Sequence, residues 1–93
     1  MKYVLKITPR AASDIRYGID YYNGQQKKLG ARFGSVINDT LTSIKKMPLV
    51  ASIAYGDMRY KVVDKFPYVI LYTIQGNSIS IIRVFNTYQQ LVY

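Results

Sequence analysis

The segment Tyr-Val-Ile-Leu-Tyr-Thr-Ile, residues 68–74, is a nearly continuous apolar run. Gln-Gly-Asn follows at 75–77, and a second apolar run occupies 79–85. A run of this length bounded by turn residues is typical of a central strand. Because Gln-Gly-Asn is a hairpin signal, these residues predict two neighbouring strands, and the rest of the fold is organised around them.

Two further strands are predicted earlier in the chain. Residues 58–64 alternate, which predicts a strand with two different faces. One face carries Met58, Tyr60 and Val62, and the other carries Arg59, Lys61 and Val63. Residues 3–8 are β-rich and are bounded by Pro9, so they predict a first strand.

The residues between these strands predict two helices. Thr8-Pro9 is typical of a helix start, and Asp14 is near that start, where the helix dipole favours a negative charge. The first helix carries an apolar face at helical spacing, formed by Ala12, Ile15, Ile19 and Tyr22. It is expected to stop at Asn23-Gly24. The second helix keeps helical spacing over residues 29–47 and ends at Pro48.

The element order is therefore β-α-α-β-β-β, in one domain over residues 1–93. Helices grouped before a strand meander predict an α+β fold, with a helical hairpin packed on one face of a small, mainly antiparallel sheet. The first strand must pair at an edge or beside the last strand. The opposite face is left open, and we expect Arg59 and Lys61 to project from it.

Composition excludes several classes of function. The chain of 93 residues has no Cys and no His, and its net charge is +8. Without Cys it cannot form disulfides or carry out thiol chemistry. Without His it cannot form a Ser-His-Asp triad, and it lacks the commonest metal ligand. We therefore predict neither a metal nor a cofactor. Neither a signal peptide nor a membrane-spanning run is recognisable, so we expect a cytoplasmic protein without membrane contact.

The charge is concentrated in the first half of the chain. Residues 1–46 carry nine basic and three acidic residues, a net charge of +6. A small basic protein is attracted to nucleic acid, ribosomes or an acidic partner protein. The alternative is a charge that serves solubility alone.

Four cations in the second half are candidate phosphate contacts. Arg59 and Lys61 are two residues apart on one strand, and Lys65 continues the cluster. Arg83 lies in an apolar strand, in line with the face of Ile81 and Phe85. Arg and Lys can hold phosphates, but strands also carry charge simply because one face is solvated.

Tyrosines are the other candidate contacts. Tyr22 fits a packing face, whereas Tyr21, Tyr88 and Tyr93 are harder to bury from the pattern. Exposed tyrosines can stack on bases or dock a protein partner. Glycine-rich phosphate-loop motifs are absent from the sequence.

Local sequences along the chain resemble those of the RelE/ParE superfamily of toxins from type II toxin–antitoxin modules. They are Lys-Ile-Thr-Pro-Arg-Ala-Ala-Ser-Asp-Ile at 6–15, Ile-Asp-Tyr-Tyr at 19–22, Leu-Gly-Ala-Arg-Phe at 29–33, Tyr-Gly-Asp-Met-Arg at 55–59, Phe-Pro-Tyr at 66–68, Leu-Tyr at 71–72 and Phe-Asn-Thr at 85–87. Their order and spacing, over essentially the whole chain, resemble the ParE-type and plasmid-stabilisation branch.

The resemblance implies a cytoplasmic bacterial toxin that a cognate antitoxin neutralises. RelE-like members cleave mRNA in the ribosomal A site, whereas ParE-like members poison DNA gyrase. Antitoxins wrap their toxins with an acidic helix or strand, which suits the +8 charge. A dimer, or a heterotetramer with the antitoxin, is compatible with the sequence, which requires neither.

Departures from the nuclease pattern bear on mechanism. Arg59 and Lys61 match the second-strand cations of RelE-like nucleases, but the third-strand Arg position falls near Val69. Many members read His-Thr-Arg-Arg after the last strand, and this chain reads Asn-Thr-Tyr-Gln at 86–89. A non-catalytic toxin that binds gyrase therefore ranks ahead of a ribosome-dependent mRNA endoribonuclease. A non-toxic basic nucleic-acid-binding domain is a third interpretation.

Each interpretation assigns residues to roles. The target-binding prediction comprises Arg59, Lys61, Lys65, Arg83 and Tyr88. If the chain is a nuclease, the catalytic candidates are Arg59, Lys61, Arg83 and Tyr93. Tyr21 and Tyr22, on the helical hairpin, are predicted to bind the antitoxin.

Overall fold

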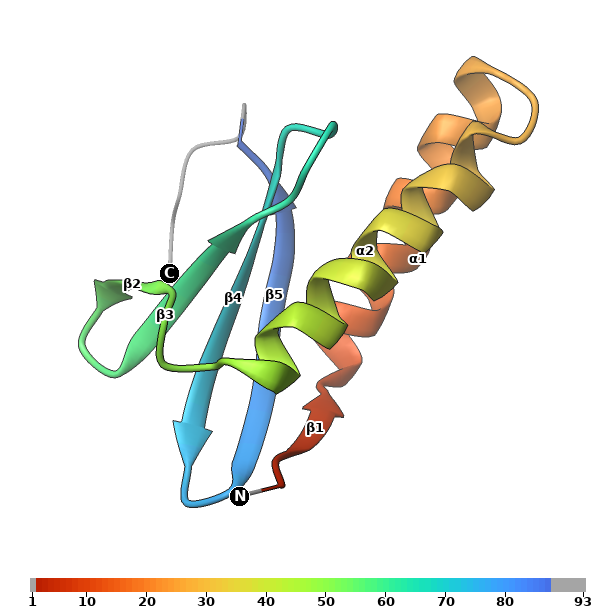
Figure 1. The fold of residues 1–93 in the computed structure, drawn as a ribbon. Coiled ribbons are helices and arrows are strands. Elements are labelled where there is room, and N and C mark those ends of the chain that lie inside the picture. Colours follow the sequence, from red (N-terminus) through yellow and green to blue (C-terminus); the bar gives the residue numbers. More distant parts are fainter. Residues whose placement is uncertain (1, 88–93) are drawn as a thin grey trace.

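The computed structural model describes residues 2–87, which form two helices and five strands (Figure 1). Their order is β1 (Val4–Ile7), α1 (Pro9–Gln25), α2 (Leu29–Lys46), β2 (Ser52–Tyr55), β3 (Met58–Val62), β4 (Tyr68–Gln75) and β5 (Ser78–Asn86). The predicted α+β class with a helical hairpin is confirmed. The strand β2 is additional: it is short, and all four of its residues are exposed, so it has no apolar periodicity to predict it.

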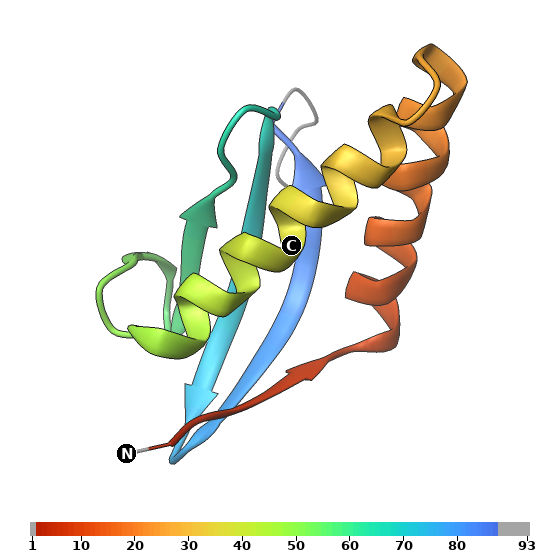
Figure 2. The same cartoon turned by 45° about the vertical axis from the view of Figure 1, so that its right-hand side comes forward.

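The strands form one sheet in the order β1-β5-β4-β3-β2. β1 runs parallel to β5, and the other pairs are antiparallel. The first strand therefore does lie at an edge beside the last strand, as predicted. Figure 2 shows α2 crossing one face of the sheet, with α1 beyond it on the side of β1 and β5. None of the described helices is long and apolar enough to cross a bilayer.

Two apolar clusters cover the two faces of the sheet. The main core lies between the sheet and the helices, with Phe33, Ile37 and Ile44 of α2 against Ile70 and Tyr72 of β4. A second cluster on the opposite face comprises Val69, Leu71 and Phe85, flanked by Met58, Tyr60 and Ile82. The face that the sequence left open is thus apolar.

The expectation that Arg59 and Lys61 project from that open face is wrong. Arg59 lies opposite Tyr72, and Lys61 lies opposite Ile70. Directly opposed residues of antiparallel strands share a face, and Ile70 and Tyr72 belong to the core beneath the helices. The two cations are therefore on the helical side of β3.

The helical hairpin depends on close approach of its two helices. A Cβ at Gly18 would meet Phe33 Cε2 at 2.6 Å, and a Cβ at Gly30 would collide with the backbone of Ile19. The predicted stop at Asn23-Gly24 is slightly early, because α1 continues to Gln25. The Asn23 side chain instead accepts a hydrogen bond from Gly30 N–H at 2.8 Å and so ties the two helices together.

Candidate functional site

The edge of β5 beyond β1 is where α1 meets the sheet. β1 pairs with β5 only as far as Ile81. Thr8, which caps α1 by accepting from Ala11 N–H at 3.2 Å, donates its hydroxyl to Ile81 C=O at 2.7 Å. One residue thus ends β1, begins α1 and fixes both to β5, as the Thr-Pro pattern indicated for the helix start.

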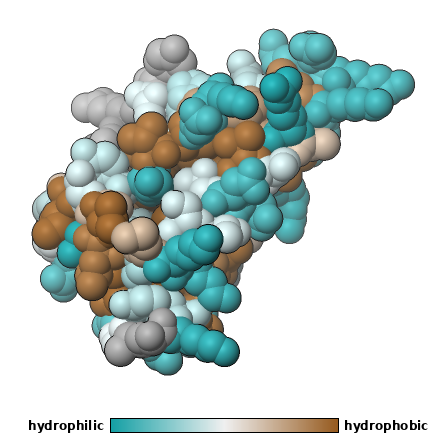
Figure 3. Space-filling model, viewed as in Figure 1, coloured by the Kyte–Doolittle hydropathy of each residue, from teal (hydrophilic) through white to brown (hydrophobic). Residues whose placement is uncertain are grey.

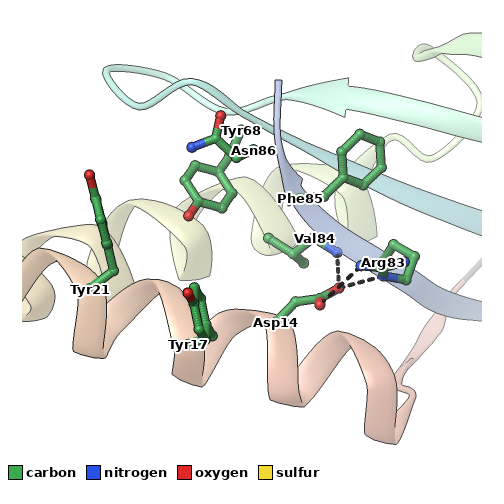
Figure 4. A pocket seen from close by; sticks show the side chains of 8 residues that line it. All are labelled: Asp14, Tyr17, Tyr21, Tyr68, Arg83, Val84, Phe85 and Asn86. Carbon is green, nitrogen blue, oxygen red and sulfur yellow. Dashed lines mark hydrogen bonds and ion pairs between the residues drawn. The ribbon is translucent and has the colours of Figure 1, made fainter. Parts of the chain in front are cut away.

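Beyond the last residue that pairs with β1, the side chain of Asp14 bonds to the edge of β5 (Figure 4). Its carboxylate accepts from Arg83 Nε at 2.7 Å, from Arg83 Nη2 at 3.3 Å and from Val84 N–H at 3.0 Å. Asp14 therefore occupies the place of a neighbouring strand at Val84. The predicted interaction of Asp14 with the first-turn dipole is wrong, because the first turn of α1 contains no acidic residue.

The predicted alignment of Arg83 with Ile81 is also wrong, whereas the alignment with Phe85 is confirmed, because Arg83 lies opposite Leu71 and Phe85 lies opposite Val69. The β4–β5 register shifts between Leu71 and Tyr72, which leaves an extra residue in β5. Ile81 and Val84 consequently both belong to the main core, while Phe85 belongs to the opposite cluster. The extra residue separates Arg83 from the face of Ile81, and the Arg83 side chain reaches Asp14 of α1 at the edge of the strand.

Next to this ion pair is an open cavity of about 290 Å³. Tyr17 and Tyr21 of α1 line one side, and Tyr68 with the end of β5 lines the other (Figure 4). Tyr17 and Tyr21 are exposed, at 73% and 50%. Burial raises the pKa of Tyr68, and the neighbouring Tyr22 adds to this, whereas a hydrogen bond from Asn86 opposes it. The cavity is a groove lined by three tyrosine side chains beside an ion pair.

Tyr22 supports this groove from behind. Its ring is 5.1 Å from Phe33, 4.9 Å from Phe66 and 6.2 Å from Tyr68, measured between ring centroids. Tyr21 contacts Tyr22 edge to face at 5.1 Å. The two tyrosines that the sequence grouped as antitoxin contacts thus have different surroundings: Tyr21 is exposed, and Tyr22 is half-buried in an aromatic cluster.

Arg59 lies on β3, one strand beyond β4 from the groove. Its Nη1 donates to Ala51 C=O at 2.7 Å and to Leu49 C=O at 3.3 Å. The neighbouring Tyr72 hydroxyl donates to Pro48 C=O at 2.6 Å. Burial raises the pKa of Tyr72, against a smaller lowering by the Arg59 charge. Both side chains hold the loop that joins α2 to β2.

Lys61 and Lys65 meet in a third place, an open cavity of about 350 Å³ between α2 and the end of β3. Asp39 and Asp64 line the same cavity. Lys65 has a positive φ of 68°, so it forms the turn after β3. Two cations and two carboxylates share this cavity, which makes its local charge balanced.

The predicted target-binding residues are therefore distributed over three places. Arg59 contacts the loop before β2, Lys61 and Lys65 face α2, and Arg83 contacts α1. Tyr88 and Tyr93 lie outside the described residues. Sequence reasoning missed Tyr17 and the role of Asp14. Their spacing with Tyr21, three and then four residues apart, places all three along one face of a helix, and that pattern could have identified the groove.

Within residues 2–87 there is no group of three or more His, Cys, Asp or Glu side chains placed to bind a metal ion. The groove between α1 and β5 presents exposed phenol rings beside an ion pair.

Comparison with protein families identifies the class. Residues 5–91 match the family described as the ParE toxin of the type II toxin–antitoxin system, parDE, and the chain belongs to this family. A significant match to a curated protein sequence was not found.

Solved structures share the fold over nearly the whole chain. One is the chromosomal ParDE toxin–antitoxin system from P. aeruginosa, with a TM-score of 0.82 at 17% identity, covering 91% of this chain and 96% of that chain. Another is the YoeB dimer from Staphylococcus aureus, with a TM-score of 0.60 at 19% identity, covering 89% and 94%.

Proposed function

We propose that this toxin is neutralised by a cognate antitoxin and acts in the cytoplasm by binding an essential target, DNA gyrase, without cutting RNA. The observation that carries the non-catalytic part is the engagement of both candidate arginines in the fold. Arg83 is paired with Asp14, and Arg59 is bonded to two loop carbonyls.

Ribonuclease chemistry needs a base, an acid and stabilisation of the charge that develops on the phosphate. Arg59 and Arg83 are on strands separated by β4, and they contact different elements: Arg59 contacts the loop before β2, and Arg83 contacts α1. The tyrosines beside them, Tyr72 and Tyr68, have pKa values raised by burial. A raised pKa disfavours the phenolate that a general base would require at neutral pH, which supports binding over catalysis.

The groove between α1 and β5 is the proposed antitoxin site. Exposed Tyr17 and Tyr21 offer large rigid contact surfaces of the kind enriched at interfaces, and Tyr22 positions Tyr21 from behind. The basic first half of the chain favours an acidic partner. The similar structure from P. aeruginosa is itself that of a toxin–antitoxin system, which supports a protein partner of this kind.

Arg59 and Arg83 hold the fold together through hydrogen bonds and an ion pair. Among the described residues, the other two predicted target contacts, Lys61 and Lys65, line an open cavity instead. We assign target contact to these two lysines. Arg59 and Arg83 contribute by positioning the surfaces around them, and Tyr88, outside the described residues, stays a predicted contact.

The test is induction of the chain without its antitoxin in a bacterial host, following growth, mRNA integrity and the DNA-damage response. The expected result is growth arrest with intact mRNA and a damage response, relieved by the cognate antitoxin. Tyr17→Ala with Tyr21→Ala should weaken antitoxin rescue while arrest persists. The control, Val4→Ala, shortens a similarly exposed side chain on β1, outside the groove.

Other outcomes would contradict the proposal. Arrest with mRNA cut within codons would establish the ribosome-dependent endoribonuclease, which the likeness to the YoeB fold also accommodates. Normal growth of cells containing the folded chain would favour the non-toxic nucleic-acid-binding domain.

A further inference from the structure

Three lysines surround an open cavity of about 380 Å³ between the C-terminal end of α2 and the residues before β1. We call this cavity the lysine cleft, and its lining consists of Lys2, Tyr3, Thr42, Lys45 and Lys46. Figure 3 shows hydrophilic surface over the C-terminal end of α2 and hydrophobic surface beside it, over the loop before β2. The lysine cleft shares no residue with the groove between α1 and β5.

Two of the lysines lie on one face of the last turns of α2. Lys45 and Lys46 follow Thr42 by three and four residues, so the three side chains are neighbours on the helix surface. They are exposed, whereas Ile44 beside them is buried and fixes this turn against the main core. Because cations stabilise the last turn of a helix, the helix alone accounts for Lys45 and Lys46. It does not account for Lys2, which comes from a different segment of the chain.

The position of Lys2 beside α2 is set by the residues that follow it. Tyr3 is half-buried and packs against the main core. Val4 N–H donates to Asn77 C=O at 2.8 Å, which ties this segment to the turn between β4 and β5. The meeting of Lys2 with the two lysines of α2 is therefore produced by the fold.

The charge of the lysine cleft is not compensated by its own lining. The groove between α1 and β5 contains one cation and one carboxylate, and the cavity at Lys61 and Lys65 contains two of each. The lysine cleft contains three cations and no carboxylate. The dipole of α2 offsets only about half a charge. Among residues 2–87 the one salt bridge joins Arg83 to Asp14, so the excess charge is available to an anionic ligand.

We propose that the lysine cleft binds the phosphate backbone of duplex DNA without sequence preference. Lysines contact phosphates as point charges, and Tyr and Thr hydroxyls are common further contacts to phosphate. The lining contains no Arg, Asn or Gln, the side chains that most often read base edges. It also contains no large aliphatic side chain. Because a protein interface buries an apolar centre, this lining suits a phosphate backbone better than an acidic protein segment.

The choice of DNA rests on the proposed function, because gyrase acts on duplex DNA and a toxin bound to gyrase meets that DNA. The lysine cleft and the groove between α1 and β5 lie at opposite ends of β5. Val4, next to the cleft, pairs with Ser78 at the start of β5, whereas residues 83–86 at its end line the groove. DNA in the cleft and a protein in the groove therefore occupy different ends of the strand.

The experiment measures the affinity of the purified chain for a fluorescein-labelled DNA duplex by anisotropy, without gyrase, between about 50 and 200 mM salt. Three phosphate contacts contribute about −2.7 to the slope of log K against log salt, which is about a 40-fold loss over this range. Lys45→Ala with Lys46→Ala should reduce the steepness of the slope by about 1.8, and Lys2→Ala should reduce it by about 0.9.

The matched control is Lys27→Ala with Lys28→Ala, at an exposed pair of lysines between α1 and α2. It makes the same change of net charge as the variant of α2 and should leave the slope unchanged. Circular dichroism of each variant establishes that it is folded. Equal slopes for the two double variants would overturn the proposal, because net charge alone would then attract the DNA.

Other results would also contradict a DNA site. They are an absence of binding at the lowest salt concentration, displacement of the duplex by inorganic phosphate at matched ionic strength, and equally tight, lysine-dependent binding of poly-glutamate. The second would assign the cleft to a free anion, and the third would assign it to an acidic protein. Because gyrase is absent from the assay, the expected slopes would support the DNA site even where induction in cells gives no damage response. Failure of this inference is thus distinct from failure of the gyrase proposal.

Discussion

Replacing Asp14 by alanine tests whether this carboxylate substitutes for the missing neighbour of β5. The variant removes the acceptor of Arg83 Nε and of Val84 N–H, and it leaves the guanidinium at the sheet edge without its ion pair. The two side chains are partly buried, with exposed fractions of 28% for Arg83 and 17% for Asp14. The loss should therefore exceed that of a surface ion pair and fall below that of a fully buried one.

The magnitude follows from these limits. Exposed pairs contribute roughly 0.2–1 kcal/mol, and breaking a buried pair costs about 3–5 kcal/mol. Hydrogen bonds to charged groups contribute about 1.5–3 kcal/mol. We expect Asp14→Ala to lower the free energy of unfolding by about 2 kcal/mol, which corresponds to a fall in Tm on the order of 10 °C for a domain of this size.

Asp20→Ala is the matched control, because Asp20 is exposed on the same helix. It makes the same change of charge and of helix propensity, so the difference between the variants isolates the contacts to β5. Thermal and urea unfolding followed by circular dichroism measure both. A double-mutant cycle with Arg83→Ala separates the ion pair from the bond to Val84. If Asp14→Ala were no more destabilising than Asp20→Ala, the assigned role of the carboxylate would be refuted.

Three further outcomes are expected from unfolding measurements. Gly18→Ala should destabilise by about 1–2 kcal/mol, because the added methyl overlaps the Phe33 ring and the strain exceeds the gain in helix propensity; Gly24→Ala, which meets no atom within 4 Å, should be neutral or stabilising. Tyr72→Phe should cost about 1–2 kcal/mol through the loop carbonyl left without its donor; equal stability of the two proteins would count against that bond. Because burial raises the folded-state pKa of Tyr68 and Tyr72 above 10.0, the unfolded chain loses these protons first, so the contribution of these two groups to the free energy of unfolding should be constant below pH 10 and fall as the pH rises above it. A pH series of Tm values checks this, and Tyr72→Phe should reduce the fall.

The elements with strong local patterns could be predicted from the sequence. Continuous apolar runs predicted β4 and β5, and Thr8-Pro9 predicted the start of α1, because local sterics and capping decide these features. Glycine has a low intrinsic helix propensity, yet Phe33 requires position 18 of α1 to have no side chain. The advantage comes from tertiary packing, which no local pattern records.

The site was harder to predict because it depends on register. Arg59 was placed on the wrong face, since alternation within β3 does not say which face meets the helices. One extra residue in β5 was enough to separate Arg83 from the face of Ile81, and Arg83 pairs with Asp14. The face of Arg59 and the position of Arg83 both depend on pairing with residues that are distant in the chain. Helical spacing alone, in contrast, is enough to group the exposed tyrosines of α1.

The parallel pairing of β1 with β5 has a consequence for synthesis of the protein. Thr8 bonds to Ile81, 73 residues further along the chain. Contacts of such long separation slow folding, and a nascent chain emerges with its N-terminal part first. While β5 is still in the ribosome, β1 has no partner and β4 has one open side. The ribosome therefore releases a chain that has yet to complete its sheet, and any truncation before β5 should give an inert polypeptide.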